Sequence, residues 1–114
     1  MKASRAGLNL RLTLGRALFG PGKAALLEGI RDSGSIARAG RAMGMSYTRA
    51  WGLVQAMNRE FRAPLVASAK GGAARGGATL TALGARVLER YRALERRASR
   101  AAAGDLAYLR RQSR

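Results

Sequence analysis

The stretch SIARAGRAMGMSYTRAWGLVQAMN, residues 35–58, decides the fold of this chain. Ser35 and Ser46 each stand at the start of a segment rich in helix-forming residues, where a serine side chain can cap a helix N-terminus. Gly44 lies between the two segments and favours a break there. The pattern predicts a short helix that ends at Gly44, a tight glycine turn, and another helix from Tyr47 to about Phe61.

This later helix is expected to have one buried and one exposed face. At about 100° per residue, four apolar side chains gather on one face: Ala50, Val54, Met57 and Phe61. The opposite face holds Thr48, Gly52, Gln55 and Arg59. Arg49 and Trp51 flank that outer face, and the angle of Trp51 leaves two readings open, a core residue and a contact residue.

The flanking sequence predicts strands and two longer helices. Residues 8–14, LNLRLTL, alternate at period two and predict a strand, and a helix follows over about 21–32. PLVASAK and ATLT, separated by the glycine-rich GGAARGG, predict the two arms of a hairpin. A long helix begins at Thr81 and carries a heptad-like apolar seam at Leu80, Gly84, Val87, Tyr91, Leu94, Ala98 and Ala101.

The expected fold class is therefore mainly α with a small β-sheet of three strands, a winged helix-turn-helix with a long C-terminal helix. We expect a flexible N-terminus over 1–7, one DNA-binding domain over 8–103 that includes the long helix at about 81–103, and a frayed basic tail over 104–114.

Charge indicates the class of partner. The chain has 22 Lys and Arg against 6 Asp and Glu, a formal net charge of +16. Between residues 33 and 88 stand eight basic residues and the single acid Glu60. Such a surface attracts polyanions, so nucleic acid is the first candidate and an anionic membrane the second.

The residue types that are missing exclude most chemistry. The chain has no Cys and no His, and its six acids are scattered, so we expect no catalytic site, no metal and no cofactor, and hence no enzyme. No uncharged run is long enough to cross a membrane, and we expect a cytoplasmic protein with no membrane partner.

Residues 8 to about 97 resemble the N-terminal winged-helix domain of the ModE family of molybdate-responsive bacterial repressors. The resemblance rests on GKAALLEGI, SGSI, AMGMSYTRAWGLVQAMN, the GG…GGATLT hairpin and the Arg-rich helix after it; SYxxAW with the following MN is the most specific part. The plan is similar, more loosely, to LysR-type regulators. The family's hairpin usually reads GGKGGGGA, whereas here it reads GGAARGGA, so its contacts are expected to differ.

The resemblance implies a sequence-specific transcriptional regulator that binds double-stranded DNA. The family also carries oxyanion-binding domains, whereas this chain ends shortly after the long helix, so molybdate is not expected to bind this chain alone. The alternative is a nucleoid-associated or RNA-binding basic protein without sequence preference. The predicted DNA-binding residues are Arg38, Arg41, Ser46, Tyr47, Thr48, Arg49, Trp51, Gln55, Lys70 and Arg75.

The apolar seam of the long helix predicts a homodimer. So short a chain leaves such a helix partly uncovered, and a second copy can cover the surplus, although an intramolecular core is the other reading. The predicted interface residues are Leu83, Val87, Leu88, Tyr91 and Leu94.

Overall fold

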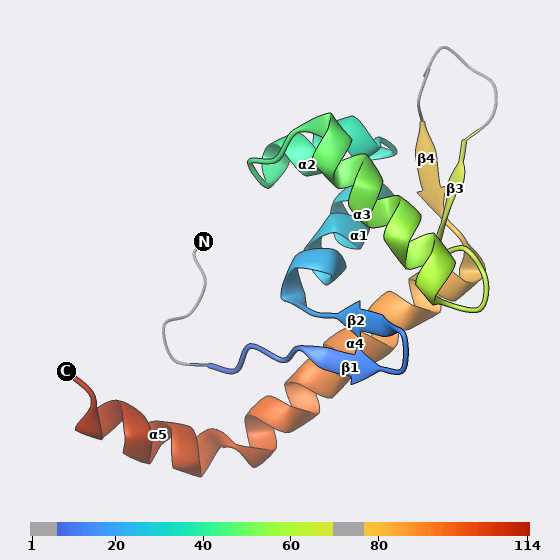
Figure 1. Ribbon diagram of the computed structural model, residues 1–114. Coiled ribbons are helices and arrows are strands. Elements are labelled where there is room, and N and C mark those ends of the chain that lie inside the picture. The colour runs from blue at the N-terminus through green and yellow to red at the C-terminus, as the bar shows by residue number, and fades with distance from the viewer. Residues whose placement is uncertain (1–6, 70–76) are drawn as a thin grey trace.

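The computed structural model describes residues 7–69 and 77–114. It is mostly helical, with four short strands (Figure 1). In chain order the elements are β1 (Leu12–Leu14), β2 (Ala17–Phe19), α1 (Pro21–Ser33), α2 (Ile36–Ala42), α3 (Tyr47–Glu60), β3 (Val66–Ser68), β4 (Ala78–Leu80), α4 (Ala82–Ala101) and α5 (Ala103–Gln112).

The predicted helix starts are confirmed by their capping bonds. The side chains of Ser35, Ser46 and Thr81 accept hydrogen bonds from the backbone N–H three residues later, at the starts of α2, α3 and α4. Pro21 occupies the first turn of α1, where its missing N–H costs nothing. Local chemistry therefore sets where these helices begin.

A close contact fixes the angle between α2 and α3. A β-carbon built on Gly40 of α2 would lie 2.7 Å from the β-carbon of Ala50 in α3, so this crossing requires a residue without a side chain. Gly44, with φ 76°, makes the left-handed turn between the helices. The two glycines bring α3 close against α2 and leave its outer face free.

The strands differ from the prediction. The expected three-stranded sheet is wrong: β1 pairs with β2 and β3 pairs with β4, each pair antiparallel, in two separate sheets. The predicted strand over 8–14 is confirmed only for its last three residues, and β2 was not predicted. A single bridge between Ser35 and Gly77 ties the β3–β4 hairpin to the start of α2.

The core lies where α1 meets α2, α3 and α4. Its largest fully buried side chains are Leu26, Leu27, Ile30, Val54, Met57 and Leu65. Phe19 makes edge-to-face contacts with Phe61 and Tyr91, at ring distances of 6.1 and 5.1 Å. This aromatic cluster joins the β1–β2 hairpin to both α3 and α4.

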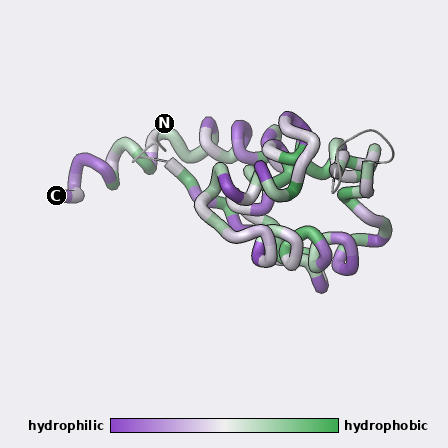
Figure 2. The backbone as a smooth tube through the Cα atoms, turned by 90° about the horizontal axis from the view of Figure 1, so that it is seen from above, coloured by the Kyte–Doolittle hydropathy of each residue, from purple (hydrophilic) through white to green (hydrophobic). Residues whose placement is uncertain are grey.

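Helix α4 runs past the body of the protein and is followed by α5, which extends away from it (Figures 1 and 2). The molecule is accordingly elongated, 53 × 28 × 19 Å. The expected frayed tail over 104–114 is wrong for most of its length, because α5 is helical from Ala103 to Gln112. Asp105 in its first turn and Arg110 and Arg111 in its last complement the helix dipole.

Candidate nucleic-acid interface

Helix α3 has an exposed outer face. Its inner face is held by Ala50, Val54 and Met57, each at most 1% exposed. Thr48, Arg49 and Gly52 are exposed on the other side, as the helical angles predict. The N-terminal half of α3 can therefore approach a large ligand without any change in the core.

Basic side chains surround this face. Arg38 and Arg41 are exposed on α2, and Arg59 and Arg62 are exposed at the C-terminal end of α3 and just after it. Glu60, the only acid of α2 and α3, lies on the side of α3 that faces α1, where its carboxylate is 3.8 Å from Lys23 Nζ. The exposed charged side chains of α2 and α3 are thus all basic, which favours a polyanion.

A cleft separates α3 from the β3–β4 hairpin. Its volume is about 160 Å³, and Tyr47, Trp51 and Gln55 line it from α3. Tyr47 is 51% exposed and Trp51 47% exposed, although both are large aromatic residues. About half of the Trp51 side chain is therefore at the surface, where a ligand can reach it.

Eight of the ten predicted DNA-binding residues lie on α2, at the N-cap of α3 or on α3 itself. Seven of them are exposed and Gln55 is partly buried in the cleft. The hydroxyl of Ser46 also accepts the hydrogen bond from Arg49 N–H, at 3.1 Å. The remaining two, Lys70 and Arg75, lie outside the described residues.

One residue at this interface was not predicted to have a role. Asn58 stands four residues after the buried Val54, so a polar side chain falls on the apolar face of α3. That unusual placement is a signal visible in the sequence. The side chain is used in three hydrogen bonds to β3 and the residue before it.

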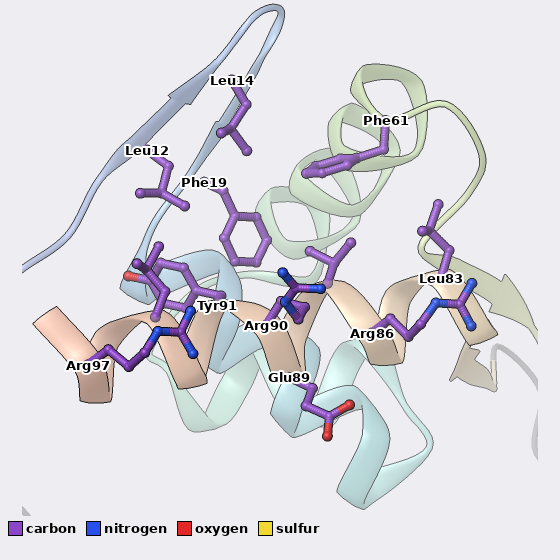
Figure 3. A pocket seen from close by; sticks show the side chains of 12 residues that line it. Leu12, Leu14, Phe19, Phe61, Leu83, Arg86, Glu89, Arg90, Tyr91 and Arg97 are labelled. Atoms are coloured by element: carbon purple, nitrogen blue, oxygen red, sulfur yellow. The ribbon is translucent and has the colours of Figure 1, made fainter.

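A second feature is an apolar groove between the β1–β2 hairpin and α4, with a volume of about 580 Å³ (Figure 3). Leu12 and Leu14 of the hairpin point into it, and Phe61 enters from the end of α3. Leu83, Val87 and Leu94, all only partly buried, line it from α4. The hairpin side of the groove was not predicted, because β2 was missed.

Two of the predicted interface residues are buried within the protomer, although Tyr91 also lines the groove. Leu88 and Tyr91 are each 3% exposed and belong to the core of the protomer itself. Burial raises the pKa of the Tyr91 phenol, and its hydroxyl donates to the carbonyl of Leu10 at 2.7 Å. The intramolecular reading of the seam is therefore correct for these two residues.

Within the described part of the chain, no three His, Cys, Asp or Glu side chains gather as they would to hold a metal ion. None of the helices described has the length and apolar character needed to cross a membrane.

Comparison with known proteins gives partial matches to regulators and to molybdenum-binding proteins. No family model matches the chain. It is 47% identical over 79 residues to the molybdenum-pterin-binding protein MopB of Rhodobacter capsulatus, and 44% identical over 70 residues to the molybdenum transport protein ModE of Azotobacter vinelandii. It is 39% identical over 88 residues to the DNA-binding transcriptional dual regulator ModE of Escherichia coli K12.

These matches cover most of this chain but a small part of each relative. They include 69%, 61% and 76% of this chain, and 29%, 26% and 34% of the respective relatives. The chain thus spans about a third or less of the length of the relatives it matches.

Proposed function

We propose that this chain is a ModE-type transcriptional regulator, or the DNA-binding part of one, that recognises a specific sequence in double-stranded DNA. In this proposal α2 and α3 form the helix-turn-helix, α3 is the recognition helix, and the β3–β4 hairpin is the wing. The similarity to the regulator of E. coli, 39% over 76% of this chain, supports the assignment. The relatives named above are regulators and molybdenum-binding proteins rather than enzymes, which agrees with a binding function.

The outer face of α3 is the observation that carries the proposal. It exposes Thr48 and Arg49 beside the small residue Gly52, while the opposite face is fully buried. An α-helix fits the major groove of B-DNA, and arginine there can donate two hydrogen bonds to guanine. We assign base contacts to Thr48, Arg49 and Gln55, and a contact with a base edge or a sugar to Trp51.

The other predicted residues are assigned to the DNA backbone. Arg38 and Arg41 are exposed on α2, the helix that packs against α3. Such contacts fix the register of a protein on the duplex without reading its sequence. We assign this role to Arg38, Arg41, Ser46 and Tyr47, and from the sequence alone to Lys70 and Arg75.

We further propose that the protein acts as a homodimer through the apolar groove. Leu83, Val87 and Leu94 on α4, with Leu14 of the hairpin at 46% exposure, leave an uncovered apolar surface that a second copy can bury. A symmetric dimer places two recognition helices on one duplex, as a site with two half-sites requires. The groove rim carries Arg86, Arg90 and Arg97 against Glu89, so self-association works against charge repulsion.

The names of the relatives connect them with molybdenum. By this association we propose that the regulated genes serve molybdenum metabolism. We also propose that DNA binding by this chain does not require molybdate.

Selection of bound fragments from random DNA tests the proposal. We expect the enriched fragments to share a motif, and the affinity for that motif to exceed the affinity for competitor DNA by at least about 10³-fold. The logarithm of the affinity should fall with the logarithm of salt concentration, by about 0.9 for each phosphate neutralised. Added molybdate should leave both values unchanged. Tight binding without any enriched motif would instead identify a basic protein that reads charge alone.

A further inference from the structure

Asn58 joins the recognition helix to the wing. Its Oδ1 accepts hydrogen bonds from the backbone N–H groups of Leu65 and Val66, at 2.8 and 3.1 Å. Its Nδ2 donates to the carbonyl oxygen of Val66 at 3.0 Å. One amide side chain therefore fixes the first residue of β3, and the residue before it, against α3.

Few side chains can replace it. The site requires an acceptor for two N–H groups and a donor for one carbonyl, at the length of an asparagine side chain. Aspartate keeps the acceptor but faces the Val66 carbonyl with a second oxygen, and alanine removes all three bonds. Because Asn58 is partly buried, the lost partners would not all be replaced by water.

The same chain segment is held from the other side by α4. The hydroxyl of Thr81 donates to the carbonyl of Pro64 at 2.7 Å, and its backbone N–H donates to the carbonyl of Leu65 at 2.9 Å. The wing is thus tied to α4 through backbone geometry and to α3 through Asn58, and the Ser35–Gly77 bridge holds the hairpin at the start of α2. Removal of the Asn58 bonds would leave the wing attached at α4 and at the start of α2, but without its side-chain hydrogen bonds to the recognition helix.

That spacing determines the width of the α3–wing cleft, which Asn58 also lines. Tyr47 and Trp51, both about half exposed, stand on its α3 side, and Ser68 and Gly77 on its wing side. When a helix occupies the major groove and a hairpin the next minor groove, the phosphate strand between the two grooves must pass between helix and hairpin.

We propose that Asn58 is a positioning residue that holds the α3–wing cleft at the width of one DNA strand, so that Trp51 packs against the sugars of that strand while the wing contacts its phosphates. This inference rests on the proposed function. It adds a role for a residue that touches no DNA, and a defined place for the exposed tryptophan.

The chain provides its own probe and control. Trp51 is the only tryptophan, so fluorescence excited at a wavelength where tryptophan but not tyrosine absorbs reports on the cleft. Asn9 is the other asparagine of the chain, and it is exposed on the segment before β1. Asn9→Asp therefore matches Asn58→Asp in charge and chemistry at a remote place.

The experiment compares the intact protein with Asn58→Asp, Asn58→Ala and Asn9→Asp at a temperature where each is folded. Affinity for a selected duplex is measured by fluorescence anisotropy. At saturating protein, acrylamide quenching reports the accessibility of Trp51, and hydroxyl-radical cleavage maps the protected sugars. We expect both Asn58 variants to bind about tenfold more weakly, with Trp51 nearly as accessible as in the free protein.

The footprint separates positioning from simple loss of stability. In both Asn58 variants, protection on the wing side should disappear while protection beneath α3 persists, and Asn9→Asp should behave as the parent protein. The proposal is overturned if the Asn58 variants retain the parental affinity and quenching, if both footprints weaken together, or if neither variant folds. Absence of DNA binding by the parent protein would instead refute the proposed function.

Discussion

Arg92 of α4 and Glu28 of α1 form a two-bonded ion pair: Nη2 and Nε donate to Oε1 and Oε2 at 2.8 and 2.9 Å. A third bond at 2.7 Å, from Arg92 Nη1 to Glu95, keeps the guanidinium in place. The side chains of Arg92 and Glu28 are 29% and 34% exposed. The pair fixes the long helix relative to the helix at the centre of the core.

Stability should therefore depend on the protonation of Glu28. The hydrogen bond from Arg92 lowers the pKa of the Glu28 carboxyl below its ordinary value of 4.5. A lowered folded-state pKa gives stability that is complete above the unfolded value and is lost as pH falls through the folded value. Urea unfolding between pH 7 and pH 3 should show this loss, and Glu28→Gln should be less stable by roughly 1 kcal/mol at pH 7 with a weaker dependence below pH 4.5.

Asp32→Asn is the matched control for this change, because Asp32 lies on the same helix. Its partner is the adjacent Arg31, at 2.8 Å. Neighbours in sequence can meet in the unfolded chain as well, so the pair adds little to the difference between states. A loss of acid sensitivity in Asp32→Asn equal to that in Glu28→Gln would contradict the prediction.

Arg49→Ala should reduce sequence discrimination. If Arg49 contacts a base, its loss costs about 1–3 kcal/mol on the selected site and much less on random DNA.

Arg75→Ala should instead weaken binding to both DNAs by a similar factor and make the salt dependence shallower by about one. Competition binding at two salt concentrations measures the sequence discrimination and the salt dependence. If Arg49→Ala weakened binding to both DNAs equally while Arg75→Ala changed the sequence preference, α3 would not be the recognition helix.

Trp51→Ala should damage binding but spare the fold. Because Trp51 is 47% exposed, we expect the free energy of unfolding to change by less than about 1 kcal/mol. Met57→Ala, on the fully buried face of the same helix, should cost roughly 2–5 kcal/mol. Urea denaturation compares the two variants. If both lost the same free energy of unfolding, Trp51 would be a core residue rather than a contact residue.

Leu94→Glu or Val87→Glu should dissociate the proposed dimer, because the carboxylate would be buried without a partner. Ala85→Glu, exposed on α4, is the control and should stay dimeric. Since the groove rim is rich in arginine, the dimer should strengthen with added salt, which screens like charges. Sedimentation equilibrium at low and high salt measures the oligomeric state. A parent protein that is monomeric at both salt concentrations would contradict the proposed dimer.

Gly40→Ala should destabilise the protein by about 1–3 kcal/mol, because the new β-carbon would clash with Ala50 and separate α2 from α3. Gly52→Ala is the matched control, since a β-carbon on Gly52 meets no atom within 4 Å. In the interior of α3 the control should gain about 0.5–1 kcal/mol. Thermal unfolding measures the melting temperature of both variants. Shifts of the same sign relative to the parent protein would contradict the proposed clash.

Sequence reasoning succeeded where structure depends on neighbouring residues. Pro21, the caps at Ser35 and Ser46 and the break at Gly44 are local chemistry, and they placed α1, α2 and α3 to within two residues. The exposed and buried faces of α3 followed from helical geometry alone. The sequence also carries a signal for α5, an acid near its start and arginines near its end, which the prediction of a frayed tail does not use.

Contacts between residues that are distant in sequence could not be predicted from local patterns. Strand β2 has three residues and gains its place from register with β1, which brings Phe19 opposite Leu12. The seam of α4 showed which residues are apolar but not what covers them, so Leu88 and Tyr91 could not be assigned to the core. Whether a surplus face meets its own chain or another depends on tertiary packing.

The bond between Tyr91 and Leu10 has a consequence for how the protein is made. The two residues are 81 positions apart, and Tyr91 also completes the aromatic cluster with Phe19. A ribosome adds roughly 5–20 residues per second, so the N-terminal hairpin waits several seconds for its partner in α4 to be synthesised. During that interval α4 does not cover Phe19 and the leucines of β1. A nascent chain stalled within α4 would therefore expose these side chains to any protein that binds apolar segments.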